Sequence, residues 1–86
     1  MEKETIYSEI REQIFIMYRN IKYLREKNGL TTKQLAEILK MREQKLIEAE
    51  NCFGVGYFHE KQLKNACAYF QISTDELLSE NLIQTN

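Results

Sequence analysis

The sequence predicts a compact all-α domain of five helices with an extended N-terminal helix. Three observations support this fold class: apolar residues recur at steps of three and four, the chain contains no proline, and its three glycines are confined to two places. Residue types that favour helices, such as Leu, Glu and Lys, are abundant. At 86 residues, the chain is long enough for one small domain with a single core.

The first predicted helix covers residues 5–28. The pair Asn28-Gly29 ends it, because glycine tolerates the left-handed backbone that closes many helices. Its main apolar residues form one stripe, the pattern of an amphipathic helix. These are Ile6, Ile10, Ile14, Met17, Ile21 and Leu24. The segment has more apolar residues than one core-facing stripe needs. The additional ones are Tyr7, Phe15, Ile16, Tyr18 and Tyr23.

A second helix is predicted over about residues 32–39. It begins where Thr31 and Gln34 have the spacing of a capping box, in which each side chain satisfies a free backbone N–H. Residues 40–51 are predicted to form a turn and then a third helix of about two and a half turns. A helix this short needs support from tertiary contacts. Its inward face carries Met41, Leu46 and Ala49.

Residues 51–57 are predicted to form a loop, because they contain Gly54-Val55-Gly56. A fourth helix should then cover residues 58–70. Its inward residues are Phe58, Leu63, Ala66, Cys67 and Phe70. Ser73 and Glu76 form a second capping box, which starts a fifth helix. Three leucines should dock this helix on the core: Leu77, Leu78 and Leu82.

The net charge of −1 gives no overall attraction to polyanions, which argues against a non-specific nucleic-acid coat protein. A sequence-specific reader of DNA is compatible with it, since such a protein needs only a local basic face. No apolar run approaches the roughly 18 residues of a membrane span. The N-terminus also lacks the charge layout of a signal peptide. We therefore expect a cytoplasmic protein with no membrane partner.

The titratable residues predict no metal, cofactor or enzymatic centre. Cys52 and Cys67 have neither metal-ligand spacing nor the number of a disulfide framework, and His59 adds no ligand cluster. Reduced thiols in a small core are the simpler interpretation. The sequence offers no nucleophile with a base, no carboxylate pair in a cleft and no glycine loop for phosphates. No small-molecule ligand is evident either.

Two stretches, NIKYLREKNGLTTKQLAEILKM and FQISTDELL, resemble the opening and closing of the phage-repressor (Cro/cI-like, XRE) helix-turn-helix family. The resemblance covers about residues 17–82, which leaves 1–16 as an N-terminal helical extension and 83–86 as a frayed tail. It implies a sequence-specific DNA-binding transcriptional regulator from a bacterium or phage. Such a protein would be a repressor that binds double-stranded DNA by operator occupancy.

The resemblance also assigns structural roles to individual positions. It places Arg25 and Glu50 in an inward-facing salt bridge between the first helix and the end of the third. Ala36 would keep the second and third helices close together. The packing residues of the motif would be Leu35, Ala36, Leu39, Met41, Leu46 and Ala49.

The third helix would face the bases with Arg42, Glu43, Gln44 and Ile47. Gln44 could pair bidentately with adenine, Arg42 could reach guanine or a phosphate, and Glu43 could accept from the cytosine amino group. Ile47 could touch a thymine methyl group. Phosphates would be held by the start of the second helix and by lysines. The candidates are Thr32, Lys33, Lys40 and Lys45.

The chain departs from the family pattern at several of these positions. Thr32 stands where the family often has Gln, and Lys40 stands where the turn usually has Gly. A lysine with left-handed backbone costs roughly 1 kcal/mol there. The stretch NCFGVGYFHE has no Lys or Arg, and Glu48 has no evident base partner. These departures support an alternative to the DNA-binding regulator: a protein–protein interaction module on a helix-turn-helix scaffold that has lost DNA binding.

The apolar residues of the N-terminal extension would form an exposed patch if nothing covered them. They either fold back onto the domain or pair with a second chain. We expect a homodimer, because helix-turn-helix proteins commonly bind two half-sites one DNA turn apart. The dimer candidates are Ile6, Tyr7, Ile10, Ile14 and Phe15.

Overall fold

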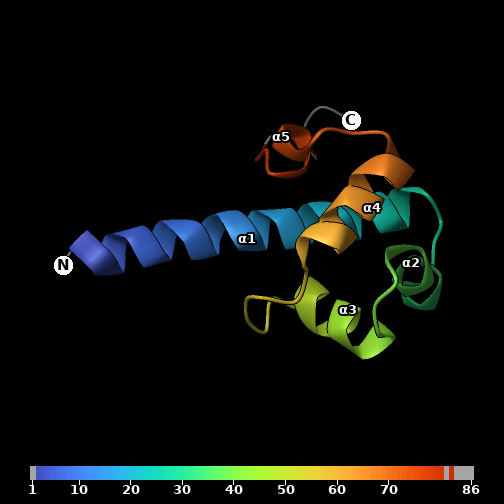
Figure 1. Cartoon of the computed structure of the whole chain (residues 1–86), viewed down its shortest axis with the longest axis horizontal. Coiled ribbons are helices and arrows are strands. Elements are labelled where there is room, and N and C mark those ends of the chain that lie inside the picture. Colours follow the sequence, from blue (N-terminus) through green and yellow to red (C-terminus); the bar gives the residue numbers. More distant parts are fainter. Residues whose placement is uncertain (1, 81, 83–86) are drawn as a thin grey trace.

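A computed structural model of the chain describes residues 2–80 and 82, and describes side chains from residue 9 onward. These residues form five helices and no strand, so the predicted all-α fold class is confirmed (Figure 1). The helices are α1 (Glu2–Lys27), α2 (Thr32–Leu39), α3 (Glu43–Glu50), α4 (Glu60–Phe70) and α5 (Thr74–Leu77).

The long helix α1 sets the shape of the molecule. Its 26 residues span about 39 Å at 1.5 Å per residue, close to the longest extent of 42 Å. The C-terminal half of α1 lies among the other helices, whereas its N-terminal half extends beyond them (Figure 1). Helix α1 packs on α3 and α5, and α2 packs on α3 and α4.

The core contains more of α1 than a single stripe. Met17, Ile21 and Leu24 are buried as predicted, but Tyr18 is also buried, at 1% exposure, and so is Ile16. Helices α3 and α5 both contact α1, and Tyr57 and Phe58 pack their rings against Tyr18, with centroids 6.1 and 5.5 Å away. Tyr18, which the sequence pattern placed outside the core-facing stripe, therefore belongs to the core.

Toward its N-terminus the apolar stripe of α1 loses its cover. Ile14 and Phe15 still pack against the core, but Ile10 is 49% exposed. The expected boundary after residue 16 falls inside continuous helix, since α1 runs unbroken from Glu2. The frayed tail expected at residues 83–86 lies outside the described residues, as do the side chains of Ile6 and Tyr7.

Helix α2 begins and ends as the sequence predicts. The backbone N–H of Gln34 donates to the Thr31 hydroxyl at 3.1 Å, and the Thr31 N–H donates to Gln34 Oε1 at 2.8 Å. At the other end of α2, Lys40 has a φ of 60°, and its backbone N–H donates to the carbonyls of Ala36 and Glu37 in the final turn. Met41 is half-buried in the following turn, and its backbone N–H donates to the Ala36 carbonyl at 3.0 Å. Met41 therefore packs against the core from the turn before α3, and not from the inward face of α3 itself.

Helix α3 begins at Glu43, after an extended Arg42 that makes no side-chain cap. The packing residues assigned by the resemblance occupy the core, except for half-buried Met41. Those buried are Leu35, Ala36, Leu39, Leu46 and Ala49.

Helix α4 begins at Glu60, two residues later than predicted, because the His59 N–H is capped by Gln62 Oε1 at 2.9 Å. Its expected inward residues are buried or packed against the core.

A buried asparagine anchors the C-terminal segment. Asn20, 2% exposed, donates from Nδ2 to the carbonyls of Leu77 and Ser79 at 2.7 and 2.9 Å. Helix α5 begins at the predicted capping box, where the Glu76 backbone N–H donates to the Ser73 hydroxyl at 3.1 Å. Leu77 and Leu82 are buried, but Leu78 is 38% exposed, so its predicted docking role was wrong. Because α5 is only one turn long, it buries Leu77 and leaves the adjacent Leu78 outside.

Candidate nucleic-acid interface

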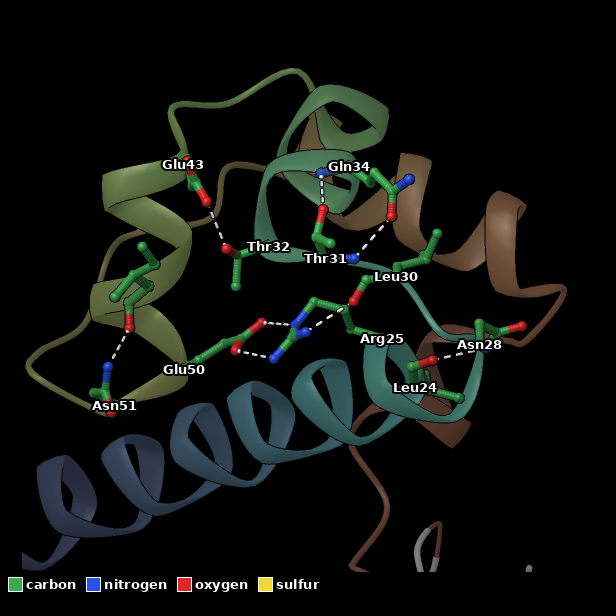
Figure 2. Close-up of polar contacts among 11 residues, drawn as sticks. Leu24, Arg25, Asn28, Leu30, Thr31, Thr32, Gln34, Glu43, Glu50 and Asn51 are labelled. Atoms are coloured by element: carbon green, nitrogen blue, oxygen red, sulfur yellow. Dashed lines mark hydrogen bonds and ion pairs between the residues drawn. The ribbon is translucent and has the colours of Figure 1, made fainter.

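The ion pair predicted between Arg25 and Glu50 is present and fixes the C-terminal end of α3 to α1 (Figure 2). Arg25 Nε and Nη2 donate to the two Glu50 carboxylate oxygens at 2.7 and 2.9 Å. Arg25 Nη1 donates in addition to the Leu30 carbonyl at 2.9 Å. The pKa of the Arg25 guanidinium is raised, chiefly by the hydrogen bond to Glu50. Glu50 thus belongs to the scaffold and not to the outer face of α3.

The outer face of α3 presents the predicted base-reading residues to solvent. Arg42, Glu43, Gln44 and Lys45 are exposed, and Ile47 is half-buried. Lys33 and Lys40 are exposed on α2 and in the turn. A short helix held on its inner side and free on its outer side has the geometry to enter a DNA major groove.

The start of α2 is joined directly to α3. The Thr32 hydroxyl donates to Glu43 Oε2 at 2.6 Å (Figure 2). This contact brings a phosphate candidate and a base-reading candidate together. The first turn of α2 contains no acidic residue of its own, and a helix N-terminus favours an anion. The Glu43 carboxylate therefore lies where an incoming phosphate would approach, and a phosphate would have to share Thr32 with it.

Glu48, which had no evident partner in the sequence, is held by two neighbours. Its Oε1 accepts from the Tyr57 hydroxyl at 3.2 Å, and its Oε2 accepts from Gln44 Nε2 at 3.4 Å. The Lys45 ammonium lies 5.7 Å from the centre of the Tyr57 ring, a cation–π distance. The pKa of the Tyr57 phenol is raised by burial and then by the Glu48 charge.

Sequence reasoning missed Tyr57 as part of this face. The residue lies in the loop after α3, nine positions beyond Glu48, where no helical periodicity relates the two. An aromatic residue beside the glycines of that loop was the only available signal. In the structure the ring packs edge-on against Tyr18, with centroids 6.1 Å apart. The Tyr57 N–H also donates to the Tyr18 hydroxyl oxygen at 3.5 Å. Tyr57 therefore links α3 to the core.

From residue 9 to residue 80, and at residue 82, no group of three His, Cys, Asp or Glu residues is arranged to hold a metal ion. Within the same described part, no helix combines the length and the apolar character needed to cross a membrane.

Comparison of the chain with protein-family models, with curated proteins and with solved structures gives no match. Functional assignment therefore depends on α2, the turn, α3 and the side chains they expose.

Proposed function

We propose that this chain is a sequence-specific DNA-binding transcriptional regulator, a repressor that acts in the cytoplasm by occupying its operator. One observation carries the proposal: α2 and α3 are joined by the short turn of residues 40–42, and the bidentate Arg25–Glu50 pair holds α3 with its polar face outward. An α-helix so presented fits the width of the DNA major groove. The resemblance to the phage-repressor family supports the same function.

Most exposed groups of α2, the turn and α3 have a role in this proposal. Gln44 reads adenine, and Arg42 contacts guanine or a phosphate. The start of α2, with Lys33, receives a phosphate through its free N–H groups. Lys40 and Lys45 add contacts to the DNA backbone, which contribute to affinity without carrying sequence information. Repression then needs no catalytic step, because an occupied operator excludes other proteins.

Selection of duplexes from a random pool at low salt tests this function. The wild-type chain should enrich one sequence, and Gln44→Ala should lose the preference at a single base pair. Gln13→Ala, an exposed glutamine on α1, is the matched control and should retain it. Affinity should fall steeply with salt, with a logarithmic slope of about −0.9 per phosphate contact. Failure to enrich any duplex at low salt would refute the proposal.

A protein-interaction module remains a second candidate because of a specific set of apolar side chains. Phe53 is 72% exposed and Val55 54% exposed in the loop after α3, and Ile10 is 49% exposed on α1. The acidic Glu43 beside Thr32 also weakens the attraction of this face for phosphate. Here Phe53→Ser should abolish binding to a partner protein, whereas Gln44→Ala should not affect it. The DNA-binding proposal predicts the reverse: Gln44→Ala should impair binding to DNA, and Phe53→Ser should not affect it.

A further inference from the structure

The outer face of α3 contains a carboxylate that reads no base in the proposal above. Both oxygens of Glu48 are engaged, one by the Tyr57 hydroxyl at 3.2 Å and the other by Gln44 Nε2 at 3.4 Å. Gln44 itself is exposed, whereas Glu48 and Tyr57 are half-buried. Glu48 therefore bridges the anchored loop after α3 and the side chain proposed to read adenine.

The chemistry of a carboxylate fixes which end of the Gln44 amide faces Glu48. An ionised carboxylate only accepts hydrogen bonds, whereas an amide has a donating NH₂ group and an accepting oxygen. If the amide turned over, its oxygen would face the carboxylate oxygen, and two acceptors would repel each other. In this contact the Gln44 NH₂ group therefore faces Glu48, and Oε1 faces away from it.

The far side of Glu48 is connected to the core. The Tyr57 backbone N–H lies 3.5 Å from the hydroxyl oxygen of Tyr18, and Tyr18 is 1% exposed. The centre of the Tyr57 ring lies 6.1 Å from that of the Tyr18 ring and 5.7 Å from the Lys45 ammonium. Tyr57 thus restrains the Glu48 carboxylate, and Glu48 in turn restrains Gln44.

We propose that Glu48 is a specificity-determining positioning residue, which sets the direction in which Gln44 presents its acceptor and donor to a base pair. Adenine offers the complementary pair, a donor at N6 and an acceptor at N7. A glutamine with a fixed amide can match that pair in one direction only. This inference rests on the proposed DNA-reading function and assigns Glu48 no contact with DNA.

Two variants separate orientation from charge. Glu48→Gln keeps the size of the side chain but can either donate or accept, so the Gln44 amide is free to turn over. Tyr57→Phe removes only the hydroxyl that restrains Glu48 and leaves the charge unchanged. Glu37→Gln on α2, where Glu37 is exposed, repeats the charge change of the first variant on another helix. Melting curves of all three verify folding.

The readout is the ratio of affinities for two duplexes that differ at one base pair. That pair is the one at which Gln44→Ala loses its preference for adenine. Wild type should favour adenine by roughly tenfold or more, the range expected of a bidentate contact. Glu48→Gln should reduce the ratio to below about threefold. Tyr57→Phe should reduce it less, and Glu37→Gln should leave it unchanged while raising both affinities.

A measurement without DNA tests the restraint itself. The side-chain amide NMR signals of Gln44 should be displaced from those of the exposed Gln13 in the wild-type chain, because one N–H of Gln44 donates to Glu48. In Glu48→Gln the Gln44 signals should move toward the Gln13 positions. Identical Gln44 signals in the two proteins would overturn the inference. An unchanged base preference in Glu48→Gln, with wild type binding its duplex, would overturn it while leaving the proposed function intact. If the wild-type chain selects no duplex, the result refutes both this inference and the proposed function.

Discussion

At the scale of single residues, the Arg25–Glu50 pair ties the C-terminal end of α3 to α1. The two side chains are 13% and 6% exposed, and two hydrogen bonds join them. Removing one partner of a buried pair leaves the other charge desolvated and alone, which costs about 3–5 kcal/mol. We therefore expect Glu50→Ala to lower the free energy of unfolding by that amount in urea denaturation.

The control for this prediction is the double variant Arg25→Met, Glu50→Leu, which removes both charges. Replacing a buried ion pair by apolar residues of similar size is often neutral, so the double variant should recover most of the lost stability. Glu12→Ala, an exposed carboxylate on α1, should change little. An unchanged urea midpoint for Glu50→Ala would contradict the structural role assigned to the pair.

A second residue-scale prediction concerns the buried phenol of Tyr18. Burial raises the pKa of Tyr18 above its ordinary value of 10.0, and burial also raises that of Tyr57. Because the folded state holds these protons more tightly than the unfolded state, their contribution to stability is complete below about pH 10. It is lost as the pH rises through the raised pKa values. Tyr18→Phe should therefore lose less stability than wild type between about pH 9 and about pH 11. Parallel losses in the two proteins would refute this.

Several residue contacts could not have been predicted from the sequence. Asn20 bonds the Leu77 carbonyl across 57 positions, and Tyr57 reaches Glu48 from a loop. No local period or cap relates such partners, because each contact depends on how two distant segments pack. Arg25 and Glu50 are also distant in the sequence, but both match positions to which the family pattern assigns a common role.

At the scale of elements, the accuracy of each predicted helix boundary follows from its capping chemistry. Helix α2 and helix α5 start where Thr31 and Ser73 form capping boxes, and both boxes are readable in the sequence. Helix α3 starts after Arg42, which makes no side-chain cap, so nothing in the sequence marked its first residue. The burial of a broad band on α1 was equally hidden, because it depends on how α3 and α5 each pack against α1.

The turn between α2 and α3 yields a prediction of its own. Lys40 adopts a φ of 60°, a left-handed conformation that disfavours a residue with a Cβ atom. Glycine adopts it without that penalty, so Lys40→Gly should stabilise the fold by about 1 kcal/mol in thermal or urea unfolding. Glu37→Gly, inside α2, should instead destabilise it by about 1 kcal/mol. A Lys40→Gly protein less stable than wild type would contradict the assignment. If Lys40 also contacts a phosphate, the salt slope of DNA binding should fall by about 0.9 in this variant.

At the scale of the whole molecule, the projecting half of α1 is the feature that one chain does not account for. Ile10 is 49% exposed and Val55 54% exposed, and together with Arg11 and Ile14 they line a shallow hollow of about 140 Å³. One α3 helix, which carries Glu43 and Glu48 beside a single basic residue, Lys45, supplies few phosphate contacts. Two copies would double the number of contacts and could reach half-sites one DNA turn apart. We therefore propose that a second copy of the chain covers this end of α1.

Light scattering during size-exclusion chromatography should give the mass of two chains at micromolar concentration. Ile10→Lys should yield a monomer that still melts cooperatively, because Ile10 lies outside the core and its replacement leaves the packing of α1 intact. Glu12→Gln makes the same change in net charge about 200° away around the helix, and should remain dimeric. Ile10→Lys should also bind a two-half-site duplex far more weakly, yet bind a single half-site as wild type does. A wild-type protein that elutes with the mass of one chain would rule out the dimer, and the exposed Ile10 and Val55 would then favour the protein-interaction function.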